Sequence, residues 1–203
     1  MEPRAFLLYG KSGAGKGTQA ELLKTYLREN DPKRNVLSLS TGEKVRALAK
    51  QNSHSAELIK EVMESGGLMP AFVPVMIWAS LFIENASGDE HFLLDGLTRR
   101  PEEAPVLEGA LLFYERVPYD VIVINVSDEE ATKRLLGRGR LDDRSEEIKR
   151  RLNWYEELVV PTIDFFRESE HARVHDIHGE QSEEDVYKEI LNVLFNDKNN
   201  DKN

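Results

Sequence analysis

A glycine-rich run near the N-terminus constrains this chain more than any other feature. Residues 10–19 read GKSGAGKGTQ, after an apolar stretch at residues 5–9 and before a helical pattern from residue 20. In this order of strand, glycine-rich loop and helix, backbone N–H groups wrap a phosphate at a helix N-terminus. Lys16 adds a positive charge for the terminal phosphates of a nucleotide. The hydroxyl that usually follows this lysine comes one residue later, at Thr18. The segment therefore predicts a nucleotide-binding protein rather than an unrelated glycine-rich turn.

Apolar stretches typical of buried strands alternate with helical patterns along the chain. They lie at residues 5–9, 36–39, 91–94, 121–126 and 172–177. This alternation predicts a parallel sheet with helices on both faces, and ligands at the carboxyl ends of the strands. The fold class that we expect is α/β, with a five-stranded parallel sheet of the P-loop NTPase type. Residues 43–63 read as two short helices that break near residues 51–53.

The composition excludes several kinds of partner and site. A net charge of −10 at pH 7 argues against binding to nucleic acid or to an anionic membrane surface. The absence of cysteine excludes disulfides and cysteine-ligated zinc, and the five histidines show no spacing typical of metal ligands. Because no apolar run is long enough to span a membrane and the N-terminus carries no secretion signal, we expect a cytoplasmic protein.

A second chemical signal lies at the end of the third expected strand. The apolar residues 92–94 are followed by Asp95. A carboxylate at this point can hold Mg²⁺ beside a triphosphate, directly or through water. Beside a phosphate loop, this function is favoured over the alternative of a simple polar turn.

A third signal is a crowd of arginines at residues 134–143. Arg134, Arg138 and Arg140 lie there, with glycines on both sides of Arg138 and one glycine directly before Arg140. Guanidinium groups bind phosphates bidentately and keep their charge. For Arg138 and Arg140 this favours phosphate binding over the alternative of a solvated helix face. For Arg150, the solvated helix face is the better interpretation.

Six segments of the chain follow one another in a recognisable order. They are GKSGAGKGTQ at residues 10–19, STGEKVR at 40–46, GLMP at 67–70, DGLTR at 95–99, RGRLDD at 138–143 and HGEQ at 178–181. In sequence and spacing they resemble the motifs of the adenylate kinase family of nucleoside monophosphate kinases, in its short-lid form. The likeness runs nearly from end to end.

The resemblance implies reversible phosphoryl transfer from ATP to a nucleoside monophosphate, with AMP as the expected acceptor. It implies Mg²⁺ but no zinc, no nucleic acid or membrane partner, and a monomer. It further implies a single kinase domain over residues 1–203. Within it we expect a core at 1–39, 73–137 and 145–195, an acceptor-binding segment at 40–72, a short lid at 138–144 and a disordered tail at 196–203.

The resemblance also assigns roles to individual residues. Those that it places around the transferring group are Lys16, Arg99, Arg138, Arg140 and Arg151, with Asp95 anchoring the hydrated Mg²⁺. Those implied for ATP are Gly13, Ala14, Gly15, Lys16, Gly17, Thr18, Arg134, Arg138 and Gln181. Those implied for the acceptor are Thr41, Arg46, Gly67, Leu68, Met69, Gly96, Arg99, Glu103, Arg140 and Arg151.

Departures from the family pattern leave the acceptor base open. Glu103 stands where the family usually has Gln, and a carboxylate can only accept hydrogen bonds. Guanine offers two adjacent donors, so GMP rivals AMP unless Glu103 faces solvent or its loop shifts. Arg100 replaces a usual Thr and is either a second phosphate contact or exposed.

One apolar segment has two interpretations. Phe72, Met76 and Trp78 are expected to be core residues of a helix, with base stacking as the alternative.

Two other functions are compatible with a phosphate loop. A kinase for a small metabolite would keep Lys16 and Asp95 but would have no use for the segments at 41–46 and 138–151. A nucleotide-dependent switch would need no arginines for a second anionic substrate. Arg46 and Arg99 therefore favour a kinase that acts on two nucleotides.

Overall fold

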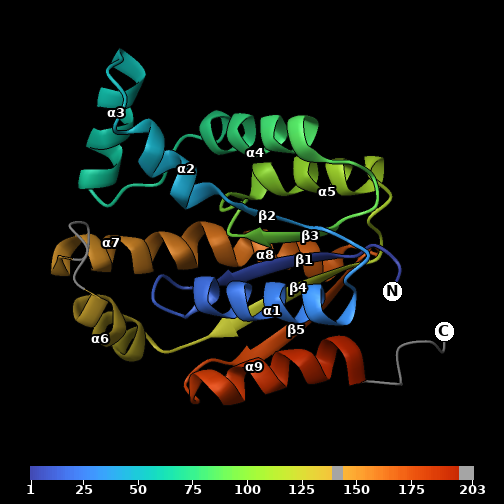
Figure 1. Cartoon of the computed structure of the whole chain (residues 1–203). Coiled ribbons are helices and arrows are strands. Elements are labelled where there is room, and N and C mark those ends of the chain that lie inside the picture. The colour runs from blue at the N-terminus through green and yellow to red at the C-terminus, as the bar shows by residue number, and fades with distance from the viewer. Residues whose placement is uncertain (139–143, 197–203) are drawn as a thin grey trace.

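The computed structural model describes residues 1–138 and 144–196 and shows an α/β fold around a five-stranded sheet (Figure 1). All strand pairs are parallel, in the order β2-β3-β1-β4-β5. The strands are β1 (Ala5–Gly10), β2 (Val36–Ser40), β3 (His91–Asp95), β4 (Tyr119–Asn125) and β5 (Ala172–His178). The expected sheet is thereby confirmed. Arg140, the interior of the expected lid and the tail from residue 197 lie outside the described residues.

The helices precede and follow the strands as the sequence pattern predicts. They are α1 (Lys16–Asn30), α2 (Thr41–Leu48), α3 (His54–Glu64), α4 (Phe72–Asn85), α5 (Ala104–Phe113), α6 (Asp128–Arg138), α7 (Ser145–Trp154), α8 (Val160–Glu168) and α9 (Glu183–Leu191). The expected break between two short helices is confirmed: Ser53 caps α3, where its hydroxyl accepts the N–H of Ala56. No helix within residues 1–138 and 144–196 is both long and apolar enough to cross a membrane.

The central strands β1, β3 and β4 are buried on both faces, which explains why they read as apolar runs, whereas the edge strands β2 and β5 are partly exposed and carry more polar residues. Leu7 and Tyr9 face a core formed with α4, α5 and α8, whereas Phe6 and Leu8 face a second core formed with α1, α7 and α9. Figure 1 shows α4 and α5 on one side of the sheet and α1 and α9 on the other. The sheet is thus the middle of three layers.

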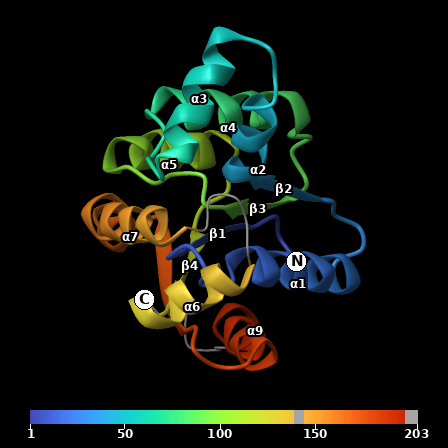
Figure 2. The same ribbon diagram turned by 90° about the vertical axis from the view of Figure 1, so that its left-hand side faces the viewer.

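The carboxyl ends of β1, β2 and β3 meet at one edge of the sheet. Asp95 at the end of β3 is in register with Leu8 of β1 and Ser40 of β2. Figure 2 looks onto this edge, with α2 and α3 above it, α6 below it and α7 to the left. A parallel sheet leaves its ligand-binding loops at this edge.

The segment between β2 and α4 has a small core of its own. Val45 of α2, Ile59 of α3 and Met69 pack with Val73 and Ile77 of α4. This core joins α2 and α3 to the first turns of α4.

The burial of α4 corrects one expectation. Trp78 is 1% exposed and belongs to the core, as predicted, but Phe72 is 72% and Met76 51% exposed. The helix is apolar on all sides, so its hydrophobicity does not indicate which side faces the sheet. Phe72 and Met76 are one helical turn apart, on a side that the sheet does not cover.

Candidate functional site

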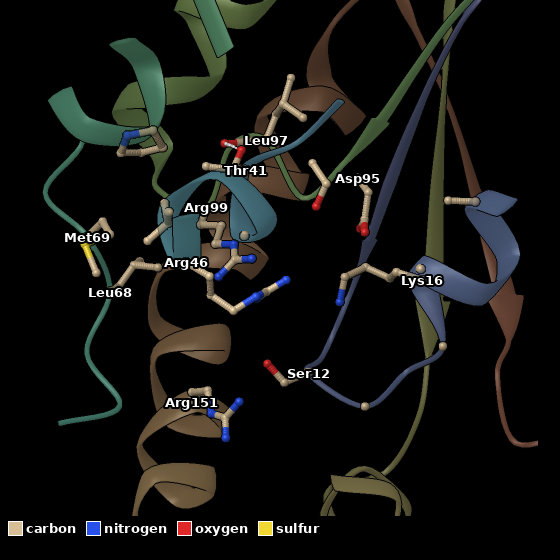
Figure 3. Close-up of a pocket in the computed structure, with 18 of the residues that line it drawn as sticks. Ser12, Lys16, Thr41, Arg46, Leu68, Met69, Asp95, Leu97, Arg99 and Arg151 are labelled. Atoms are coloured by element: carbon tan, nitrogen blue, oxygen red, sulfur yellow. Dashed lines mark hydrogen bonds between the residues drawn. The ribbon is translucent and has the colours of Figure 1, made fainter. Parts of the chain in front are cut away.

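A cavity of about 720 Å³ lies at the carboxyl edge of the sheet (Figure 3). It gathers most of the residues that the motifs single out, from segments far apart in the sequence. The predicted residues that line it are Gly13, Gly15, Lys16, Gly17, Thr18, Thr41, Arg46, Gly67, Leu68, Met69, Asp95, Arg99, Glu103, Arg134, Arg138 and Arg151.

Three other predicted residues do not line the cavity. Ala14 is buried in the core beneath the phosphate loop. Gly96 shapes the turn before Arg99 with a φ of +59°. The amide of Gln181 donates to the carbonyl of His178 at 3.0 Å and to the carboxylate of Glu189, so it is engaged in the turn between β5 and α9.

The phosphate loop takes a shape that needs glycine. Gly13 and Gly15 have φ values of +88° and +93°, which L side chains rarely adopt. A Cβ on Gly13 would also lie 2.8 Å from the carbonyl oxygen of Ala131. Helix α1 begins directly after Gly15, and no side chain caps its first turn. Its N-terminal N–H groups are thus available for an anion.

Lys16 stands at the mouth of this loop. Its ammonium donates to the carbonyls of Gly10 at 2.7 Å and Lys11 at 3.0 Å. The pKa of Lys16 is lowered to about 8, mainly by burial and also by the positive charges of Arg99 and Arg138, against the opposing effect of Asp95. Little negative charge therefore balances the buried ammonium, and a bound phosphate would raise its pKa again.

Asp95 faces the phosphate loop across the cavity (Figure 3). A Cβ on Gly17 would lie 4.0 Å from the Oδ2 atom of Asp95, so the carboxylate is close to the start of α1. Oxygen ligands next to a phosphate site suit Mg²⁺, a hard cation that keeps several waters.

Three arginines from different parts of the fold converge opposite the phosphate loop. Arg46 comes from α2, Arg99 from the turn after β3 and Arg151 from α7 (Figure 3). Burial lowers the pKa of Arg99, and the nearby charges of Arg46 and Arg151 lower it further, although Asp95 and Glu103 oppose them. Like charges this close together favour a bound anion between them.

The remaining predicted cations within the described residues belong to α6. Arg134 donates to Glu130 at 2.8 Å and to the carbonyl of Gly179 at 2.9 Å, which ties α6 to the turn after β5. Arg138 ends α6 and lines the cavity. Its charge reaches Lys16, whose pKa it lowers.

The two departures from the family pattern have structural explanations. Glu103 is 1% exposed, and its Oε2 atom accepts the backbone N–H groups of Arg99 at 2.7 Å and Arg100 at 3.3 Å. Burial raises the pKa of Glu103, against the lowering effect of these two hydrogen bonds. Arg100 is neither a phosphate contact nor exposed, because its guanidinium donates to the carbonyls of Met69 at 3.1 Å and Leu68 at 3.3 Å.

Trp154 is a cavity residue that the motifs did not indicate. Its indole N–H donates to the carbonyl of Gly66 at 3.2 Å, and its ring lies 5.8 Å from the guanidinium of Arg99. Such a contact stabilises a cation over the face of the ring. The available signal was spacing, since Trp154 follows Arg151 by three residues and so shares its side of the helix.

The lowered pKa of Lys16 leads to a pH prediction. We expect kcat/KM for ATP to fall as the pH rises through about 8, because the ligand-free protein then loses the ammonium that meets the phosphates. We expect kcat to stay level over the same range, since bound phosphate raises the pKa of Lys16. Initial rates between about pH 7 and 9.5 test this.

The matched control is Lys16→Arg, which cannot lose its charge in this range. Its kcat/KM is expected to be lower but independent of pH. A level kcat/KM for the wild type would contradict the prediction.

Comparisons with known proteins agree with the motifs and the geometry. The family model described as adenylate kinase matches residues 8–171. An adenylate kinase of Leptospira biflexa is 35% identical over 195 residues, covering 94% of this chain and all of the relative. An adenylate kinase of Corynebacterium urealyticum is 36% identical over 189 residues, covering 93% of this chain and 97% of the relative. A uridylate kinase of Saccharomyces cerevisiae is 29% identical over 193 residues, covering 91% and 87%. From these matches, the chain belongs to the adenylate kinase family and is a phosphotransferase that acts on nucleotides.

Proposed function

We propose that this protein transfers the γ-phosphoryl group of ATP to AMP, reversibly, to form two molecules of ADP. One observation carries the proposal: positive charges face each other from two sides of a single cavity, which we take as two anion sites. Lys16 and the phosphate loop form one, and Arg46, Arg99 and Arg151 form the other. A nucleotide switch needs only the first site, whereas two nucleotides that meet at their phosphates need both.

The proposed reaction needs positioning and charge rather than a protein nucleophile. A phosphate oxygen of AMP attacks the γ-phosphorus, and the bond from that phosphorus to the bridging oxygen of ADP breaks. The transition state is loose and spreads negative charge over the equatorial oxygens, so aligned cations lower the barrier. The side chains that we place around the moving group are Lys16, Arg99, Arg138, Arg140 and Arg151.

The other residues are proposed to hold the two nucleotides. For ATP they are Gly13, Ala14, Gly15, Gly17, Thr18, Arg134 and Gln181, mostly through the backbone of the loop. For AMP they are Thr41, Arg46, Gly67, Leu68, Met69, Gly96 and Glu103. We also propose a monomer as the active form, as the family resemblance implies.

Mg²⁺ is proposed to bind the donor phosphates beside Asp95, through water. The carboxylate fits this role because it lies next to the start of α1, where the phosphates would rest. When bound, the ion supplies positive charge to the phosphate oxygens.

The contacts of Glu103 support adenine over guanine. To read guanine, the carboxylate would have to accept two adjacent base donors. Its Oε2 atom already accepts two backbone N–H groups. The remaining oxygen can serve one base donor, as the amide oxygen of the usual Gln does.

We expect AMP to be the best acceptor in a panel of AMP, GMP, UMP and CMP with Mg-ATP. Its kcat/KM should exceed the others by about tenfold or more, since a mismatched polar edge in a closed site costs at least that much. Coupled detection of the diphosphate products measures these rates. UMP is the informative competitor, because a relative that is 29% identical is a uridylate kinase.

Glu103→Gln tests the role of this side chain, with the exposed neighbour Glu102→Gln as the matched control. If Glu103 mainly holds the turn, the ratio of AMP to GMP turnover changes by less than about threefold, because the amide oxygen still accepts the backbone donors. Wild-type turnover of GMP or UMP at or above that of AMP would refute AMP as the acceptor. ATP hydrolysis without transfer to any monophosphate would refute the kinase function and favour a switch.

A further inference from the structure

Three side chains from outside the segment between α3 and α4 hold the backbone of residues 65–69, which we call the acceptor loop. Arg150 donates to the carbonyl of Ser65 at 2.7 Å, and Trp154 donates to that of Gly66 at 3.2 Å. Arg100 donates to the carbonyls of Leu68 at 3.3 Å and Met69 at 3.1 Å. Four carbonyls of one short loop thus receive donors from α7 and from the turn after β3.

The acceptor loop also touches α7 through its backbone. Gly66 is buried, has a φ of +67° and lies so close to α7 that a Cβ would be 3.0 Å from the Cα of Glu147. At the other end of the loop, Met69 packs in the small core with Val45 and Ile59. The loop is therefore fixed to α7 at one end and to α2 and α3 at the other.

The same donors are linked to the arginine that faces the second anion site. The ring of Trp154 lies 5.8 Å from the guanidinium of Arg99, and Arg100 follows Arg99 directly. Glu103 accepts the backbone N–H groups of both arginines. One set of contacts therefore sets both the position of the loop that lines the cavity and the position of Arg99.

We propose that Arg100, Arg150 and Trp154 form a latch that positions the acceptor site, by docking the acceptor loop against α7 and the turn after β3. This rests on the proposed function for its ligand, a nucleoside monophosphate. Because the latch touches the loop backbone and the surroundings of Arg99, it sets the affinity for the acceptor. Its contacts lie on the acceptor loop and beside Arg99 rather than on the phosphate loop, so ATP binding does not depend on it.

Kinetics separate this role from a merely structural one. We expect Arg100→Ala to raise KM for AMP by about tenfold, because two charge-assisted hydrogen bonds are lost. We expect KM for ATP to change by less than about twofold. Arg100→Lys keeps the positive charge but loses the planar guanidinium with its paired donors. Its KM for AMP should therefore lie between the values of the wild type and of Arg100→Ala. Trp154→Phe keeps a ring beside Arg99 but removes the N–H donor, and should raise KM for AMP by about threefold.

On α7, Arg150→Ala tests the latch and Lys149→Ala is its matched control. Both substitutions remove one positive charge from the exposed side of the same helix. Only the first removes a donor to the acceptor loop, so only Arg150→Ala should raise KM for AMP. An unchanged KM for AMP in Arg100→Ala, or an equal change in KM for ATP, would overturn the latch.

Tryptophan fluorescence tests docking of the loop without any nucleotide. The chain has two tryptophans. Trp78 lies in the core away from the cavity, and its indole nitrogen has no hydrogen-bond partner among the described residues. Trp78→Phe should therefore fold and leave Trp154 as the reporter.

In that background, we expect Arg100→Ala to make Trp154 about twice as accessible to acrylamide, because the loop that covers its N–H edge is released. Equal quenching with and without Arg100 would overturn the latch even if no monophosphate is turned over. Failure of the proposed function shows instead as absent transfer in the wild type, so the two failures are distinguishable. If Trp78→Phe does not fold, the KM comparison in the wild-type background decides alone.

Discussion

Replacement of Lys16 by methionine should lower kcat/KM for ATP by about a thousandfold or more, with most of the loss in kcat. The ammonium of Lys16 lies at the mouth of the phosphate loop, close enough to Asp95, Arg99 and Arg138 for their charges to shift its pKa. Methionine has a similar length but no charge to offer to the transferring group. Steady-state kinetics with saturating AMP measure the effect.

The matched control is Lys11→Met in the same loop. The ammonium of Lys11 is held by Asp128 at 2.6 Å and Glu156 at 3.1 Å and does not line the cavity. Its replacement should change kcat/KM by less than about fivefold, since partly exposed ion pairs contribute little. Similar losses in the two variants would mean that a general effect on the loop, rather than the charge of Lys16, is responsible.

Arg138→Ala should lower kcat by about a thousandfold, the lower end of the range for arginines that stabilise phosphoryl transfer. This corresponds to a loss of about 4 kcal/mol of transition-state stabilisation. Arg138 ends α6 and lines the cavity, and its charge acts on Lys16. Because the charge is redistributed between the phosphoryl group and the leaving oxygen only during transfer, the effect should appear in kcat more than in KM.

Arg144→Ala serves as the control for Arg138→Ala. Arg144 precedes α7, is exposed and does not line the cavity. Its replacement should leave kcat within about twofold, as for an ordinary surface change. A loss below about tenfold in Arg138→Ala would remove Arg138 from the residues proposed around the transferring group.

The parts of the fold that follow local rules could be predicted from the sequence. The phosphate loop and Lys16 could be predicted directly, because the features that indicate them depend on neighbouring residues. These features are a buried strand, glycines that tolerate a positive φ, and the start of a helix. The same holds for Asp95, which simply ends an apolar strand. The break between α2 and α3 was predicted near residues 51–53, and in the structure Ser53 caps α3.

Side-chain direction could not be predicted in this way. Glu103 and Arg100 differ from the family pattern. From the sequence, Glu103 was expected to contact the acceptor base, and Arg100 to be either a second phosphate contact or exposed. In the structure Glu103 caps the turn before α5, and Arg100 points to the acceptor loop. Phe72 and Met76 were expected in the core because α4 is apolar all round, but they are exposed.

The sequence by itself determined the class of fold, the phosphate loop and the order of the cationic motifs, because each of these depends on residues a few positions apart. Only the tertiary structure decided which cations share one cavity and which side chains hold the acceptor loop. Arg46, Arg99 and Arg151 are far apart along the chain and meet because α2, the turn after β3 and α7 come together at the carboxyl edge of the sheet. Arg100 and Trp154 acquire their partners only through this packing, since a carbonyl acceptor is present in every residue and carries no mark in the sequence.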